Sequence, residues 1–147
     1  MPDAIVKRLD EMESFYDGMV VRARAALGIT SWGMQVFEFP PGFDGYPNHH
    51  HGEGAVDPGQ EELYVPLSGS ATLLLNGERH RLEPGAWARV GIAELRRIVP
   101  GEEGLHCLVI GGTPGKAFVP PGVDRARRCT AEDAERLSRG TRAPAAA

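Results

Sequence analysis

The sequence contains little cysteine, and it has no long apolar run. Only Cys107 and Cys129 occur among its 147 residues, too few for a disulfide scaffold and at a spacing that fits no zinc knuckle. Cys107 stands in the apolar run LHCLVIGG and is predicted to be a small buried hydrophobe. No apolar run approaches the roughly 20 residues that a membrane helix needs, and the N-terminal MPDAIVKRLDEME lacks the apolar stretch of a signal peptide. We therefore expect a cytoplasmic protein in a reducing environment, with no membrane partner.

The sequence also lacks a basic stripe. Its formal net charge is −4, and the arginines near the C-terminus alternate with acidic residues. Nucleic acid is therefore not an expected partner. Hydrophobic residues make up 41% and charged residues 24%, which is typical of a soluble globular protein. The length fits one domain that can bury a core without disulfides.

Glycine and proline are abundant, with 19 and 12 residues. They divide the chain into short β-prone runs such as GMQVFEF, ELYVPL, ATLLL, LRRIV and LHCLVI, separated by breaks such as LSGS and VPGEEG. This pattern predicts an all-β sandwich or barrel. Asn76-Gly77 is predicted to form a hairpin turn, because both positions favour φ above zero there. Pro66 lies inside a predicted strand, which indicates an edge position or a bulge.

The β-rich part is expected to form one domain with its flanking segments. We predict an N-terminal arm over residues 1–25, a barrel over 26–120 and a C-terminal tail over 121–147. The tail contains TAEDAERLSR, a short helix candidate with Thr130 as its N-cap and acidic residues in its first turn.

The stretch YPNHHHGEGAVDPGQEELYVPL contains three of the five histidines. His49 and His51 are two apart, so on an extended strand both imidazoles point to the same face. Glu61 or Glu62, at the start of the next apolar run, could supply a carboxylate to the same site. Two histidines and one carboxylate can hold Fe(II) with open positions, and the same ligands accept Zn, Mn, Ni or Cu. The alternative is a solvated, histidine-rich loop.

These residues resemble the cupin superfamily, whose fold is a small jelly-roll β-barrel. Its first motif has a glycine, a His-x-His pair, a glutamate, six residues and a glycine. Here Gly45 precedes His49 and His51, and Glu62 is followed after six residues by Gly69. The resemblance is carried by EELYVPLSGSATLLLNGE and implies that His49, His51 and Glu62 bind one divalent transition metal.

The chain departs from the family pattern in both motifs. Three residues separate Gly45 from His49, where the pattern has five. Ten residues separate His51 from Glu62, more than is usual, and this insert is expected to form a loop at the barrel mouth. The second motif keeps Pro84-Gly85, but its histidine ligand position falls on Arg96. A guanidinium has no lone pair to offer and cannot coordinate a metal.

The fourth ligand position therefore has three possible explanations. The site can be a three-residue triad, His80 or His106 can complete it, or the metal can be lost. Arg96 can also bind an anionic substrate, or it can be a surface residue. Tyr64 should share the face of Glu62, either to bind substrate or to pack in the core.

Two functions remain open from the sequence. The resemblance implies a metal-dependent enzyme, of the dioxygenase, isomerase or cyclase type, that acts on a small anionic or oxygen-rich metabolite. The alternative is a non-catalytic binding module for a small anionic ligand, with the metal site partly lost. The resemblance also implies a homodimer, which would cover edge strands.

Overall fold

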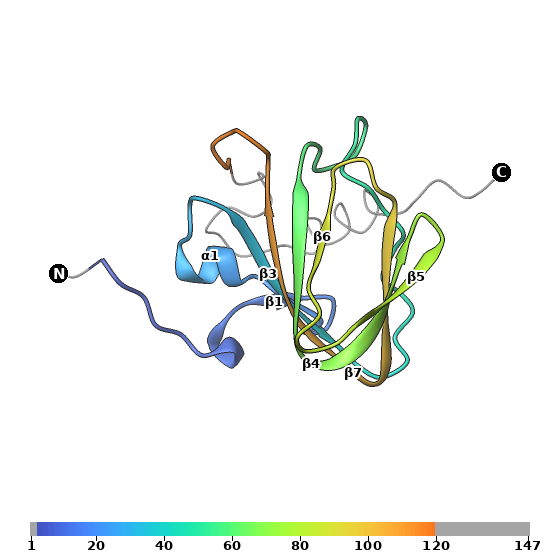
Figure 1. The fold of residues 1–147 in the computed structure, drawn as a ribbon. Helices are drawn as coiled ribbons and strands as arrows, with labels where there is room; N and C mark the ends of the chain where they lie inside the picture. The colour runs from blue at the N-terminus through green and yellow to red at the C-terminus, as the bar shows by residue number, and fades with distance from the viewer. Residues whose placement is uncertain (1–2, 120–147) are drawn as a thin grey trace.

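A computed structural model describes residues 3–119 as one curled antiparallel sheet (Figure 1). The strands follow the order β1-β2-β3-β7-β4-β5, and β6 also pairs with β4. Their bounds are β1 Ser14–Phe15, β2 Val20–Val21, β3 Gly33–Phe39, β4 Glu61–Leu75, β5 Glu78–Leu82, β6 Ala88–Val90 and β7 Arg96–Gly112. The helical elements are the 3-10 turn η1, Leu9–Glu11, and the helix α1, Ala23–Leu27. The all-β prediction is confirmed.

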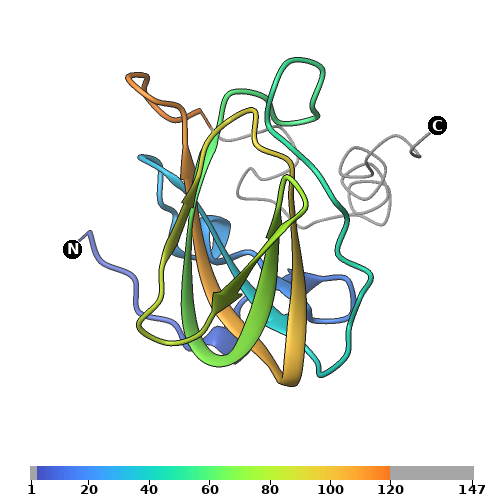
Figure 2. The same cartoon turned by 45° about the vertical axis from the view of Figure 1, so that its right-hand side comes forward.

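Strands β4 and β7 are the two longest strands, and they pair with each other along most of their length. The sequence prediction of strand breaks at LSGS and VPGEEG was wrong. Each strand runs through its glycine-containing segment and curves there (Figure 2). Gly69 and Gly104 meet at this bend with φ of +73° and +75°, and a Cβ on Gly69 would lie 2.1 Å from the Gly104 carbonyl oxygen. Glycine therefore permits a bend here in place of a turn.

Two local predictions are confirmed. Asn76 and Gly77 join β4 to β5 with φ of 50° and 87°, as a tight hairpin requires. Pro66 is followed by a register shift between β4 and β7, so it lies beside a bulge. On its other side β4 has no paired strand at Pro66, because β6 pairs with residues 62–64 and β5 with residues 71–75, so the expected edge position also holds locally.

The main core fills the interior of the barrel. It contains alternate residues of the paired strands, which point to one face of the sheet. Its buried members are Val20, Phe37, Phe39, Tyr64, Ala71, Leu73, Leu82, Val90, Ile98, Leu105, Cys107 and Val109. Cys107 is fully buried and its burial raises its thiol pKa to about 12, which fits the predicted hydrophobic role.

The N-terminal segment covers the outer face of the sheet near β3. A second cluster of Val21, Ala23 and Val36 is packed there against η1 and β7 residues. The arm predicted over residues 1–25 thus contributes two strands and a helix to the fold. No helix in residues 3–119 is long and apolar enough to cross a membrane. Cys129 and the helix predicted from Thr130 lie outside the described residues.

Candidate metal centre

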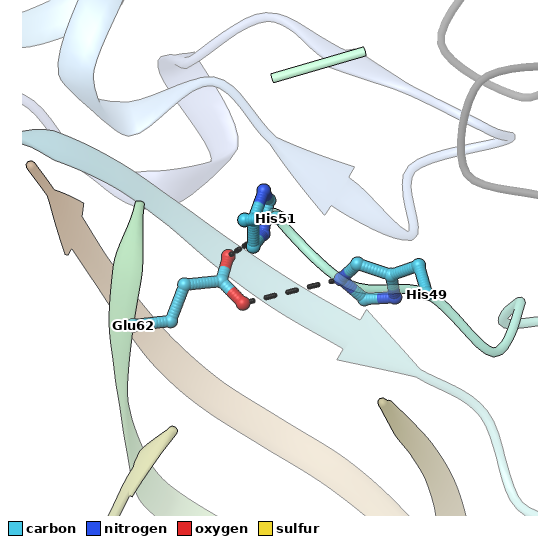
Figure 3. Close-up of side chains that lie close together, drawn as sticks. All are labelled: His49, His51 and Glu62. Carbon is cyan, nitrogen blue, oxygen red and sulfur yellow. Dashed lines mark ion pairs between the residues drawn. The ribbon is translucent and has the colours of Figure 1, made fainter. Parts of the chain in front are cut away.

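Three of the predicted ligands meet inside the barrel (Figure 3). Nε2 of His51 lies 3.3 Å from Oε1 of Glu62, and Nε2 of His49 lies 3.9 Å from Oε2. One ligand atom from each residue lies within 4.8 Å of the other two. His49 and His51 are buried, and the Glu62 side chain is 14% exposed.

Strand alternation decides which glutamate enters the site. Glu62 points inward at the start of β4, beside the buried Tyr64 two residues later. Glu61 points outward and forms a surface ion pair with Arg89 at 2.8 Å. Glu62, and not Glu61, is therefore the glutamate that lies beside the histidines, and its role as a ligand stays a prediction.

Backbone pairing holds the histidine segment against the opposite side of the barrel. His49 forms an isolated β-bridge with Arg96, with N···O distances of 2.9 and 2.8 Å. The amide N–H of His51 donates to the Ile92 carbonyl at 2.9 Å. The insert after His51 forms turns from Gly52 to Gly59, as a loop was expected to do.

Two carbonyl groups fix the orientation of the imidazole rings. Nδ1 of His51 lies 2.7 Å from the Asp57 carbonyl, and Nδ1 of His49 lies 3.2 Å from the Pro47 carbonyl. Because a carbonyl only accepts hydrogen bonds, each Nδ1 must carry the proton. In the neutral rings each Nε2 then presents its lone pair toward Glu62. Such outer-shell hydrogen bonds are typical of metal-ligating histidines.

The lone pair of His51 faces a carboxylate, and two acceptors at this distance require a cation between them. Among residues 3–119 no hydrogen bond of good geometry reaches Nε2 of His51. Burial lowers the pKa of His51, but the contact with Glu62 and its charge outweigh this and raise that pKa above its ordinary value. In the metal-free protein a proton on His51 can supply the missing positive charge; a metal ion can take its place.

The other two ligand candidates stay in the protonation states that metal binding needs. Burial lowers the pKa of His49 to about 4, so this ring is neutral near pH 7. Burial alone would raise the pKa of Glu62, but its contact with His51 and the charges of both histidines lower it to about 2. Glu62 is therefore a carboxylate at any physiological pH.

Arg96 and Tyr64 both contact the Glu62 carboxylate. The guanidinium of Arg96 is fully buried, and its Nε lies 3.7 Å from Oε2 of Glu62. Its Nη2 donates to the Gly91 carbonyl at 2.9 Å. The Tyr64 hydroxyl donates a hydrogen bond to Oε2 of Glu62. Arg96 is thus an interior residue, and the substrate-binding role suggested for Arg96 and Tyr64 stays a prediction.

The remaining histidines lie elsewhere. His80 is half exposed on β5 and pairs with Glu78, and His106 pairs with Glu38 on the outer face at 3.4 Å. Nδ1 of His50 accepts the amide N–H of Gly52. The metal-ligand cluster found in residues 3–119 contains none of these three.

A cavity of about 370 Å³ opens beside the three residues. His49, His51 and Glu62 line it together with many aromatic and apolar side chains, and Arg96 and Tyr64 do not. Two parts of this lining were not predicted from the sequence. Tyr46 lies edge-on to His49 with ring centroids 5.3 Å apart, and the N-terminal segment supplies Phe15. The alternation of Phe37 with Phe39 could have indicated an aromatic inner face of the barrel. Nothing in the N-terminal sequence indicated that Phe15 lies at the cavity.

Comparisons with known proteins support the same architecture. No family model matches the chain, and no curated protein matches it. Among solved structures, a cupin protein from Bacteroides fragilis is similar with a TM-score of 0.61 and 20% identity, over 81% of this chain and 92% of that one. A cupin-superfamily sugar phosphate isomerase from Silicibacter pomeroyi is similar with a TM-score of 0.57 and 20% identity, over 79% of this chain and 77% of that one. At this identity the likeness shows the fold.

Proposed function

We propose that this cupin-fold protein is a metal-dependent enzyme that acts on a small metabolite through an oxygen atom of its substrate. The ion would be one divalent transition metal, from among Fe, Mn, Ni, Cu and Zn, held by His49, His51 and Glu62. The reaction would be of the dioxygenase, isomerase or cyclase type. An anionic or oxygen-rich metabolite would place its oxygen where the three side chains meet the cavity.

One observation carries the proposal. One ligand atom from each of the two histidines and one carboxylate oxygen lie within 4.8 Å of one another at the wall of a cavity, with both Nδ1 atoms in contact with carbonyl groups. This donor set leaves coordination positions open, as in the facial arrangement of two histidines and one carboxylate. A divalent ion at this point would supply Lewis acidity toward a substrate oxygen.

The chain's own residues would prepare the site for that chemistry. Tyr64 and Arg96 hold the Glu62 carboxylate in one orientation from behind. Burial raises the pKa of Tyr64 well above its ordinary value, so this hydroxyl remains a hydrogen-bond donor. The apolar lining of the cavity excludes water from the substrate, which strengthens electrostatic interactions there.

The rival function is a non-catalytic binding module with a partly lost metal site. It is favoured by Arg96, which gives Glu62 a permanent counter-charge without any metal. Arg96 also stands directly opposite His49, where a fourth ligand would be expected, and cannot coordinate. The two functions differ in whether the protein binds a metal ion stoichiometrically.

Metal binding to matched variants tests the proposal. Chelator-treated protein is reconstituted with Zn²⁺ or, without oxygen, with Fe²⁺, and the bound metal is counted after dialysis. We expect close to one ion per chain in the wild type and in His80→Ala, whose half-exposed ring lies outside the cluster. His51→Ala should bind far less while keeping its circular dichroism spectrum. Equal occupancy in His51→Ala would contradict the assignment of His51 as a ligand, and well under one ion in the wild type would favour the rival function.

Two broader expectations stay predictions. The described residues contain no membrane-spanning helix, and a cytoplasmic location is proposed on the sequence alone. A homodimer is proposed because Leu67 and Trp87, at the β4–β6 side of the sheet, are 50% and 69% exposed. Apolar side chains exposed in this way can be covered by a partner surface.

A further inference from the structure

The cavity beside the metal centre has a continuous wall of aromatic rings. Phe37 and Phe39 are stacked with centroids 4.7 Å apart, and Phe43 lies 5.2 Å from Phe39. Tyr46 lies 5.2 Å from Phe37 and 5.4 Å from Phe39. All four side chains line the cavity. A ligand in the cavity therefore lies against ring faces and ring edges.

This wall leads directly to the proposed metal ligands. The Tyr46 ring stands edge-on to His49 at an interplanar angle of 81°, and His49 stands edge-on to His51 at 89°. Glu62 follows at the end of this row. One end of the cavity thus carries oxygen and nitrogen atoms, while its adjoining wall is a hydrocarbon surface.

The N-terminal segment supplies further apolar lining. Phe15 and Tyr16 lie edge-to-face with centroids 5.1 Å apart, and Met19 follows after a turn. These three side chains pack against the barrel core and line the cavity. Methionine and aromatic side chains favour contact with the faces and edges of aromatic rings.

The charges at the cavity disfavour a phosphate ester. Of the described residues that line the cavity, none is lysine or arginine, and two, Glu62 and Asp57, are acidic. The Arg96 guanidinium is fully buried behind Glu62 and does not line the cavity. A phosphate group would be desolvated near two carboxylates with no lysine or arginine in contact, and burial of a poorly paired charge is costly.

We propose that the cavity binds a ligand with an aromatic body that carries a hydroxyl or carbonyl oxygen at one end. The body lies against the ring wall formed by Phe37, Phe39, Phe43 and Tyr46, and the oxygen points to the metal centre. This assignment narrows the substrate class of the proposed function and rests on it for the position of the oxygen. It separates this protein from a phosphate-binding barrel of the same fold.

A matched pair of probes tests the ring wall. Wild-type protein, metal-free and Zn-loaded, is titrated calorimetrically with 2-naphthol and with decahydro-2-naphthol, which has the same skeleton without aromatic rings. Glucose 6-phosphate is the third probe. We expect 2-naphthol to bind about tenfold more tightly than its saturated analogue, since aromatic pairs add favourable contact energy beyond area burial. Glucose 6-phosphate should show no binding and should not displace 2-naphthol.

Two aromatic-to-leucine variants locate the binding. Phe43→Leu changes a partly buried ring of the wall, and Trp87→Leu changes a ring that is 69% exposed and does not line the cavity. We expect Phe43→Leu to weaken 2-naphthol binding at least about threefold, the loss of roughly one ring pair. Trp87→Leu should bind as the wild type does.

The outcomes separate this inference from the proposed function. Selective 2-naphthol binding to metal-free protein supports the aromatic cavity even if Zn²⁺ does not bind. If Zn²⁺ binds stoichiometrically but 2-naphthol and decahydro-2-naphthol bind with equal affinity, the inference is overturned and the metal centre stands. The same holds if Phe43→Leu leaves 2-naphthol binding unchanged. Displacement of 2-naphthol by glucose 6-phosphate also overturns it.

Discussion

Replacement of Glu62 by glutamine should destabilise the metal-free protein strongly. The change keeps the shape of the side chain but removes the charge that faces Arg96 at 3.7 Å. At an effective dielectric constant of about 20, this attraction amounts to about 4 kcal/mol. Removal of one partner from a buried ion pair typically costs about 3–5 kcal/mol, because the other charge is left buried without compensation. We expect the free energy of unfolding to fall by about that amount.

Urea denaturation at pH 7 with a chelator present measures this cost without a contribution from metal. Glu61→Gln is the matched control, since that neighbouring glutamate pairs with Arg89 on the surface and should change stability by less than about 1 kcal/mol. The double variant Glu62→Gln/Arg96→Met removes both charges and should recover part of the loss. Equal stability of Glu62→Gln and Glu61→Gln would refute the inference that Arg96 depends on Glu62.

Two further predictions concern pH and the bend of the barrel. The pKa of His49 is about 4 in the folded protein, against an ordinary value of 6.5. Between these pH values the unfolded chain binds one proton more than the folded protein. The free energy of unfolding should therefore fall by roughly 3 kcal/mol as pH falls from 6.5 to 4. A pH series of urea denaturation checks this in metal-free protein, and His49→Gln should lose correspondingly less; an equal loss in both would show that His49 is not the cause. Gly69→Ala should cost about 1–3 kcal/mol more than Gly77→Ala, because both have positive φ but only Gly69 has a backbone oxygen within 4 Å of the added Cβ. Thermal unfolding of the two variants compares them directly, and equal losses would mean that the bend adjusts freely.

That His49, His51 and Glu62 lie together was predictable partly from local spacing and partly from the family motif. The spacing of His49 and His51 places both rings on one side of an extended segment, and the Glu62 position follows from the family motif. The structure brings these three together. From the sequence, Arg96 could be either an interior residue or a surface residue. Nothing in the local sequence distinguishes the two, because the choice depends on a partner, Glu62, that is distant in the chain.

The course of the long strands could not be read from the sequence. A glycine with positive φ allows either a turn or a bend, and the neighbouring strand decides between them. At Gly69 the neighbour is Gly104 of β7, so both strands continue through the bend. The placement of Phe15 at the cavity depends in the same way on contacts with a barrel that is distant in sequence.

Anomalous diffraction from crystals loaded with Zn²⁺ tests the metal centre most directly. We predict one strong anomalous peak per chain, coordinated by Nε2 of His49, Nε2 of His51 and the carboxylate of Glu62, with its open side toward the cavity. Arg96 should remain paired with Glu62 from behind. A peak only at surface histidines such as His80, with Glu62 still in contact with a protonated His51, would contradict a metal centre in this barrel.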